Sequence, residues 1–314
     1  MKKALNISII LIIVLLTVCN IININADDVN TDNTTTLAGN NITNKAKYTY
    51  QSNYLKVQIY RHQLHNPNHI YYIAEVWIKD MNQFKTCFSY DTYNDDHNVY
   101  DNTLREEGSV MAKRNNAVFA VNGSHNIGLC VHNKQVFGKL KNSRNICLIY
   151  DDGSMKVYTD YTNFNINQEL DKGLLHAWQF GPALIQNNKI LYNKKEGRAP
   201  RTAIGYIEPY HYVFLTCVGR CNKAIGMTTD ELASILYDFG CTEAFNLDGG
   251  YSSNMLFNGK RIMETAYKNR WNNGKKMDGR PINDLIYFVD IDSNLNKIIV
   301  TNYINKITNQ FGSK

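Results

Sequence analysis

The residues best suited to chemistry lie in the stretch NLDGGYSSNMLFNG, residues 246–259. It holds one acid, two adjacent glycines and two adjacent serines: Asp248, Gly249, Gly250, Ser252 and Ser253. Paired glycines let backbone N–H groups approach an anion, and serine hydroxyls add hydrogen-bond donors. The carboxyl group can act as an acid, a base or an acceptor for sugar hydroxyls. A Gly-rich turn capped by the acid explains the local pattern equally well.

A second polar cluster, Asn122-Gly123-Ser124, follows the apolar run AVFAV (117–121). Taken alone, it is more simply interpreted as an Asn-Gly turn. Two polar clusters at strand ends nevertheless indicate a shared site, because strand ends in one sheet can face the same cleft. We therefore expect Asn122 to border that cleft together with Asp248.

Three arginines stand at strand boundaries in Gly or Pro contexts: Arg201 in APRTAIG, Arg220 in CVGRC and Arg280 before DLIYFV. A guanidinium group can donate two parallel hydrogen bonds to a phosphate or carboxylate. A single arginine more often forms a surface ion pair, but three at strand boundaries favour at least one anion contact. Arg201 and Arg220 are the expected substrate-binding residues.

Other polar residues have simpler explanations. Glu231 completes a helix capping box with Thr228. His125, His132 and His176 lack metal-ligand spacing, so we expect them to be solvated or hydrogen-bonded rather than catalytic. No cysteine pair has CxxC spacing, which makes zinc a weak hypothesis. The sequence predicts no cofactor and leaves a bound metal open.

The expected elements are mostly strands. Alternating or continuous apolar runs predict strands over 54–62, 71–79, 117–121, 212–218, 243–247 and 284–289. Hairpins are expected over 145–159 and 254–263, where Asp152-Gly153 and Asn258-Gly259 supply the turns. Capping-box spacing predicts helices from Thr103 to about Arg114 and over 227–240. The predicted fold class is α+β (mixed α/β): a strand-rich sheet packed with a few helices in a single domain.

The chain of 314 residues begins with the features of a secretory signal peptide. Lys2 and Lys3 precede the apolar run IILIIVLLTV (9–18), and Ala26 stands at a cleavable position. We expect a signal peptide over 1–26, a flexible Asn/Thr-rich spacer over 27–47, the folded domain over 48–303 and a polar tail over 304–314. The mature protein is then secreted, and it associates with a membrane only if the first segment is kept as an anchor.

Charge and cysteine content add two expectations. The net charge of +6 is modest for this length and gives no indication of nucleic-acid binding. The expected mature chain keeps six cysteines, an even number that permits disulfides in a secreted protein. Their pairing is open, although a bridge between Cys217 and Cys221 would close a small loop around Arg220. They are Cys87, Cys130, Cys147, Cys217, Cys221 and Cys241.

Taken in order, several segments resemble the phosphodiester glycosidase family, and the resemblance covers roughly residues 48–290. They are MAKRNNAVFAVNG (111–123), GPALIQNNK (181–189), APRTAIGY (199–206), GR (219–220), GMTTDELA (226–233), NLDGGYSSNM (246–255), NG (258–259) and RPINDLIYFV (280–289). The resemblance implies a hydrolase that cleaves the link between a sugar and a phosphodiester in an envelope or extracellular glycoconjugate. It also implies which residues border the active site: Asn122, Arg201, Arg220, Asp248, Gly249, Gly250, Ser252 and Ser253.

This sequence departs from the family pattern at three places, which are Ser124 to Asn126 after the first Asn-Gly, Val218 and Tyr251. The departures motivate an alternative function, a non-hydrolytic carbohydrate-binding module of the cell envelope. A serine hydrolase that uses Ser252 or Ser253 would lack the usual GxSxG elbow. In the favoured hypothesis a phosphodiester leaves readily, so donors that stabilise its charge matter more than its protonation. Asp248 is the expected catalytic carboxylate.

Overall fold

Antiparallel strands form most of the structure, a computed structural model that describes residues 45–65, 67–93, 104–191, 196–264, 271–272, 275–276 and 279–291. The expected signal peptide, nearly all of the spacer and the polar tail lie outside the described residues. The described part is strand-rich with a few helices, so the predicted α+β class is confirmed.

The largest sheet has eight strands in the order β1-β2-β3-β14-β13-β15-β11-β12, and every neighbouring pair is antiparallel. Its central strands are continuous apolar runs; β14, for example, is buried along its whole length. That pattern is expected of a strand covered on both faces. The strands are β1 (Tyr48–Gln51), β2 (Leu55–His65), β3 (Asn68–Ile78), β11 (Ala183–Gln186), β12 (Lys189–Ile190), β13 (Arg201–Glu208), β14 (His211–Val218) and β15 (Glu243–Asn246).

Two five-stranded sheets accompany it. The first has the order β17-β16-β5-β20-β4 and the second the order β7-β6-β10-β8-β9. The first consists of β4 (Phe84–Phe88), β5 (Phe119–Asn122), β16 (Met255–Phe257), β17 (Lys260–Arg261) and β20 (Asp284–Phe288). The second consists of β6 (Cys130–His132), β7 (Gln135–Phe137), β8 (Asn145–Tyr150), β9 (Met155–Tyr158) and β10 (Leu174–Phe180). A short pair, β18 (Trp271–Asn272) and β19 (Lys275–Lys276), stands apart from these sheets.

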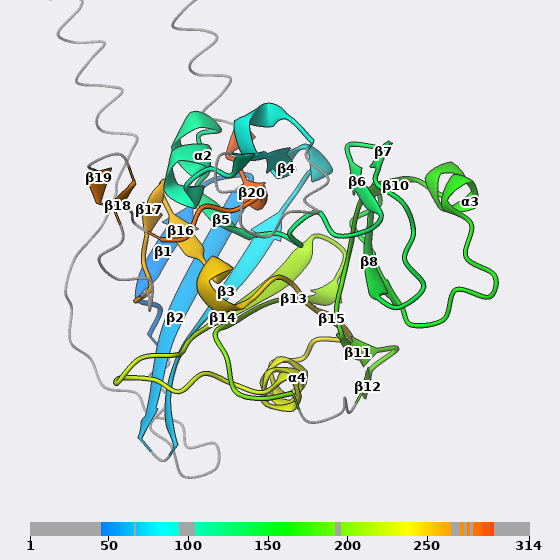
Figure 1. Ribbon diagram of the computed structural model, residues 1–314. Helices are drawn as coiled ribbons and strands as arrows, with labels where there is room; N and C mark the ends of the chain where they lie inside the picture. Colours follow the sequence, from blue (N-terminus) through cyan, green and yellow to red (C-terminus); the bar gives the residue numbers. More distant parts are fainter. Residues whose placement is uncertain are drawn as a thin grey trace, which may run out of the picture. The chain divides into compact units, whose positions relative to one another are not determined.

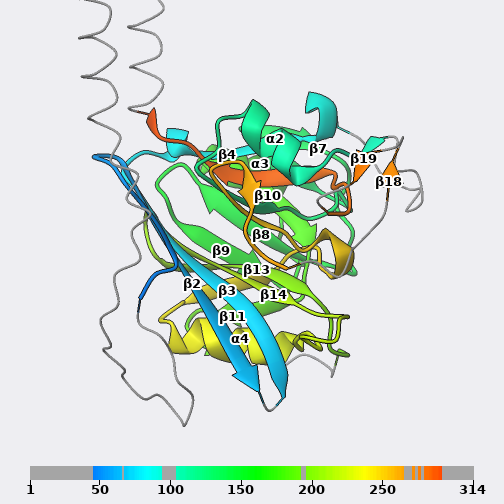
Figure 2. The same cartoon turned by 90° about the vertical axis from the view of Figure 1, so that its left-hand side faces the viewer.

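Three α-helices occur in the described part of the chain: α2 (Gly108–Arg114), α3 (Ile166–Asp171) and α4 (Thr229–Asp238). Helix α4 lies across one face of the eight-stranded sheet (Figures 1 and 2), where its apolar side packs against strands that include β11 and β14. The opposite face of that sheet joins the largest core cluster, which includes residues of both five-stranded sheets. The β-sheets thus enclose a continuous apolar core between them.

Local signals predicted several elements correctly. The Asn258-Gly259 hairpin is present with both residues at positive φ, 49° and 69°, as the tight turn requires. The hairpin at Gly153 and the capping box of α4 are also confirmed. Thr103 itself lies outside the described residues, but the prediction that the helix begins there is wrong for residues 104–107. Helix α2 begins at Gly108, because Glu106 pairs instead with Ile282 in an isolated β-bridge.

The six described cysteines all carry free thiols, so the structure contains no Cys217–Cys221 bridge. The Cys217 thiol contacts the carbonyl of Ala199 at 3.4 Å, and burial raises its pKa to about 12. No helix within the described ranges has the length and apolar character needed to cross a membrane.

Candidate active site

The turn that carries Asp248 links two sheets. It follows β15 of the eight-stranded sheet and continues through a 3-10 turn, η4 (Gly250–Ser252), into β16 of the first five-stranded sheet (Figure 1). The backbone N–H of Asp248 donates to the carbonyl of Gly123 at 3.1 Å, and that of Gly250 donates to Pro200 at 2.8 Å. Asn122 and Asp248 therefore do meet. The expectation of a single shared sheet is wrong, because β5 and β15 belong to different sheets.

Asn122 joins the two sheets through its side-chain amide. Its Nδ2 donates to the carbonyl oxygens of Asp248, at 2.8 Å, and Gly123, at 3.2 Å. Its Oδ1 accepts from Thr202 Oγ1 at 2.8 Å and from the backbone N–H of Asn254 at 3.0 Å. The side chain is only 1% exposed. Asn122 thus fixes the backbone around Asp248, and its predicted contribution to the border of the active site stays a prediction.

The Asp248 carboxylate lies between two cationic or potentially cationic groups. Its Oδ2 is 3.5 Å from His125 Nδ1 and 3.4 Å from Arg280 Nη2, while Oδ1 accepts the N–H of Gly249 at 2.8 Å. The side chain is 15% exposed, so it reaches the surface from largely buried surroundings. This placement holds the carboxylate firmly and leaves it within reach of a ligand.

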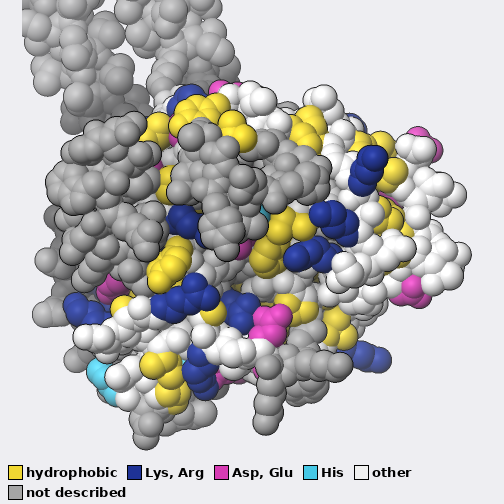
Figure 3. Space-filling model, in the orientation of Figure 1, with side chains coloured by type: hydrophobic (Ala, Val, Ile, Leu, Met, Phe, Trp, Pro, Cys, Tyr) yellow, Lys and Arg dark blue, Asp and Glu magenta, His cyan; other side chains and the backbone are white. Residues whose placement is uncertain are grey.

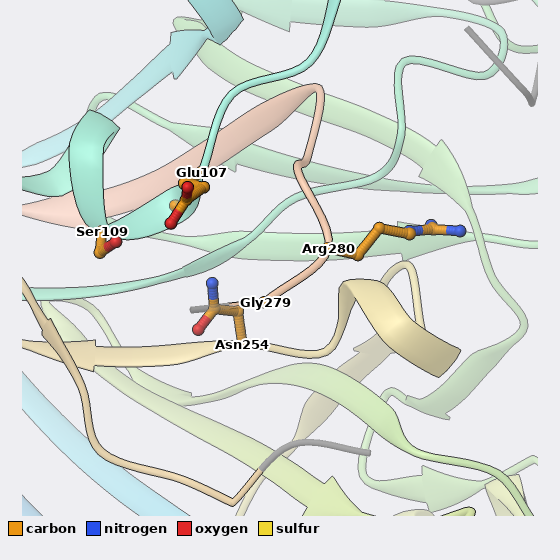
Figure 4. Close-up of a pocket in the computed structure, with 6 residues that line it drawn as sticks. Glu107, Ser109, Asn254, Gly279 and Arg280 are labelled. Carbon is orange, nitrogen blue, oxygen red and sulfur yellow. The ribbon is translucent and has the colours of Figure 1, made fainter. Parts of the chain in front are cut away.

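Arg280 connects the carboxylate with the serine pair, because its Nη2 also donates to Ser252 Oγ. Figure 4 shows the guanidinium extending away from a narrow crevice lined by α2 residues and Asn254. Ser252 and Ser253 are both buried, and the carbonyl of Ser253 accepts from Arg261 Nη2 at 2.8 Å. Of the two serines, Ser252 shares the arginine that contacts Asp248.

The two glycines serve close packing. A Cβ at Gly249 would lie 2.8 Å from the carbonyl oxygen of Pro200. Gly250 has a positive φ of 63°, and a Cβ there would lie 3.0 Å from Arg220 Nη1. Their N–H groups already donate to Asp248 and Pro200. An anion at this turn would consequently be met by side chains rather than by these two amides.

The two predicted arginines differ in their surroundings. The guanidinium of Arg201 pairs with Glu196 at 2.8 Å and donates to the carbonyls of Gly197 and Met227. Arg220 is exposed, with its Cζ 5.3 Å from the centre of the Tyr251 ring, and its φ of 55° is unusual for a residue with a side chain. Strained backbone of this kind is often found at functional sites. The departure at Val218 lies in the core instead.

Two groups at the site escaped the sequence analysis. His125 was expected to be solvated or hydrogen-bonded rather than catalytic, yet its side chain lies beside Asp248. Asp284 was not considered, yet its carboxylate accepts the backbone N–H groups of Ser124 and His125. The only available signal was the position of each residue next to a strand end. His132 and His176 pack among aromatic rings instead, and burial lowers the pKa of His176 to about 3.

Figure 3 shows Lys and Arg side chains spread across the middle of the face seen in Figure 1, a distribution suited to an anionic ligand.

Among the described residues, no group of three or more His, Cys, Asp or Glu side chains is placed to hold a metal ion.

Residues 107–289, more than half of the chain, match the phosphodiester glycosidase family. The chain belongs to this family. The match spans the Asn122 cluster, the Asp248 turn and Arg280, so the side chains that meet in the structure all lie within the family domain.

Two solved structures are similar to this one to different degrees. The catalytic domain of zebrafish N-acetylglucosamine-1-phosphodiester alpha-N-acetylglucosaminidase, described as auto-inhibited by its pro-peptide, has a similar fold with a TM-score of 0.60 and 18% identity, over 76% of this chain and 85% of that one. A putative exported protein of Burkholderia pseudomallei matches at a TM-score of 0.46 and 13% identity, over 71% of this chain and 74% of that one.

A curated relative, the SPbeta prophage-derived uncharacterized protein YomE of Bacillus subtilis, is 28% identical over 221 residues, and the match covers 61% of this chain. The matched region spans about a third of the length of YomE, 33%.

Proposed function

We propose that this protein is a secreted hydrolase that cleaves the bond between a sugar and a phosphodiester in an envelope or extracellular glycoconjugate. The observation that carries the proposal is the position of the Asp248 carboxylate between His125 and Arg280, with the Ser252 hydroxyl on the same guanidinium. Family membership supports the reaction class, and the signal-peptide pattern at residues 1–26 supports secretion.

The reaction needs two groups with opposite tasks. A water molecule attacks the anomeric carbon, the bond from that carbon to the phosphate oxygen breaks, and a phosphate monoester leaves with the electron pair. Asp248 takes the proton from the attacking water, and that proton passes to solvent after the sugar has left. Because the phosphate is a stable anion, it leaves without a proton.

Arg280 and Ser252 are proposed to stabilise the charge that grows on the departing phosphate, since a guanidinium and a hydroxyl are strong donors to phosphate oxygens. Arg220 is proposed to bind the phosphate or its second substituent at the exposed edge, beside Tyr251. The remaining predicted site residues, Asn122, Arg201, Gly249, Gly250 and Ser253, are proposed to shape the site around these contacts.

A release assay tests the proposal. The purified protein is incubated with a panel of synthetic sugar-1-phosphodiesters, and free sugar and phosphate monoester are both quantified. Equal amounts of the two products are expected from at least one substrate. The alternative function is a non-hydrolytic carbohydrate-binding module, which is motivated by the three departures from the family pattern. Saturable binding of these compounds without any product would favour this alternative. Inertness toward serine-directed fluorophosphonates is expected because the Ser252 hydroxyl accepts from the Arg280 guanidinium, which cannot take the hydroxyl proton as a general base would.

A further inference from the structure

The carboxylate of Asp284 lies directly behind the turn at 123–126. Its Oδ2 accepts the backbone N–H of Ser124 at 2.9 Å, and its Oδ1 accepts that of His125 at 3.1 Å. The side chain is 2% exposed, and the backbone of the same residue accepts the N–H of Gly123 at 3.1 Å. One residue of β20 therefore binds three successive amides of the turn.

The turn is built tightly around this carboxylate. A Cβ at Gly123 would lie 2.0 Å from Asp284 Oδ2, so no residue with a side chain fits there without displacing the carboxylate. The next residues, His125 and Asn126, have φ values of 69° and 55°, in the left-handed region that side chains disfavour. Such a conformation persists only where surrounding contacts enforce it, and the amide bonds to Asp284 are such contacts.

The position of His125 has a consequence for the site, because its Nδ1 lies 3.5 Å from Asp248 Oδ2. We propose that Asp284 is a positioning residue whose ionised carboxylate holds His125 against Asp248, and that its protonation loosens this contact. The catalytic meaning of the contact rests on the function proposed above, whereas the positioning itself does not.

The charge state matters because an ionised carboxylate only accepts hydrogen bonds, while a protonated one turns one oxygen into a donor. On protonation one of the two amides of Ser124 and His125 loses its acceptor. Burial raises the pKa of Asp284 to about 7; the two amides lower it, and the negative charge of Asp248 raises it. The switch between the two states thus falls near neutral pH.

The other titratable and charged groups around Asp284 and Asp248 come from five places. Cys87 on β4 and Cys130 on β6 are buried thiols whose pKa values are raised, that of Cys87 to about 12, so both stay neutral at neutral pH. Asp248, on the turn after β15, faces Asp284 with a negative charge, and His125 is held by Asp284 through its backbone. Arg280 contacts Asp248 on the same side of the site.

Nuclear magnetic resonance of the backbone amides tests the proposal without any substrate. In the wild-type protein the amide signals of Ser124 and His125 are expected to shift together between pH 5 and 9 with a common midpoint near 7. In Asp284→Asn this midpoint disappears. In Asp248→Asn it moves to lower pH, because the repulsive neighbouring charge is gone. Asp290→Asn, which changes another buried acid just after β20, is the matched control and keeps the wild-type midpoint.

Two results would overturn the proposal: amide signals that do not titrate in the wild type, or a titration that survives in Asp284→Asn. If Asp284→Asn does not fold, the wild-type titration and the shift of its midpoint in Asp248→Asn still test the proposal. On a cleaved sugar-1-phosphodiester, kcat is expected to fall below the same midpoint while KM changes little. Absence of turnover on every substrate would contradict the proposed hydrolase and leave the amide titration as an independent result.

Discussion

The Asp248 turn has two unlike sides. On one side lies the inner wall, which we define as the turn at 123–126 together with Arg280 and Asp284; on the other lies the outer wall, defined as Arg201, Arg220 and Tyr251. The inner wall is largely buried and hydrogen-bonded around one carboxylate, whereas Arg220 and Tyr251 in the outer wall are exposed. Buried polar groups have fixed geometry, since each lost bond is costly, while exposed ones can vary.

This difference suggests a division of work. The inner wall supplies the groups nearest Asp248, so it should control the chemical step. The outer wall contains Tyr251, where this sequence departs from the family pattern, and Arg201, whose guanidinium is already paired with Glu196. We therefore expect the outer wall to control the choice of substrate. The following substitutions separate the two walls, beginning with the largest expected effect.

Asp248→Asn should remove turnover almost completely. The amide is nearly isosteric and keeps the Gly249 contact, but it cannot take a proton from water, so kcat should fall on the order of 10²-fold or more. Sugar release by the folded variant is the measurement. Asp238→Asn, at an exposed acid at the end of α4, is the control and should be unaffected. Near-normal turnover in Asp248→Asn would move the catalytic carboxylate elsewhere.

Gly123→Ala should break the inner wall by crowding it. Because the new Cβ would lie 2.0 Å from Asp284 Oδ2, the turn or the carboxylate must shift, at a cost of about 1–3 kcal/mol in the free energy of unfolding. Urea unfolding measures this change. Gly197→Ala is the matched control, since no atom lies within 4 Å of its would-be Cβ. Equal urea midpoints for the two variants would show that the inner wall is loosely packed.

Both successes and failures of the sequence analysis follow from distance along the chain. The Asn258-Gly259 turn and the Thr228–Glu231 capping box depend on residues within four positions of one another, and both were predicted. His125 and Asp284 lie 159 positions apart, and no local pattern links them. The helix expected from Thr103 begins only at Gly108 for the same reason, since the bridge between Glu106 and Ile282 overrode a local capping signal.

The candidate site itself was predictable in part. The type and order of Asp248, its glycines and its serines marked the turn correctly, because short polar residues after an apolar strand are a local signal. Which arginine contacts Asp248 was not predictable. Arg201, Arg220 and Arg280 have similar sequence contexts, and only the pairing of β20 with β5 brings Arg280 to the carboxylate.

Arg280→Lys should show what the guanidinium adds in the inner wall. Lysine keeps the charge but offers a point charge in place of the guanidinium, whose Nη2 contacts both Asp248 and Ser252. We expect kcat to fall about tenfold, equivalent to about 1.4 kcal/mol, with a smaller change in KM. Arg61→Lys is a fitting control, because Arg61 has a similar exposure and pairs with Glu264 instead. A change confined to KM would assign Arg280 to ground-state binding.

Arg201→Lys should have the smallest effect on kcat, and it gives the sharpest test of the difference between the inner and outer walls. The Arg201 side chain is 13% exposed, but its partner Glu196 is 46% exposed, and ion pairs with such an exposed member contribute little, about 0–1 kcal/mol. A lysine can keep the attraction to Glu196 while it loses the weaker contacts to the Gly197 and Met227 carbonyls. We therefore expect kcat within about threefold of the wild type. Steady-state kinetics on the same sugar-1-phosphodiester, with Arg280→Lys measured in parallel, decides between the walls. A tenfold loss of kcat in Arg201→Lys would mean that substrate displaces Glu196 and draws this guanidinium onto the phosphate, so that both walls serve the chemical step.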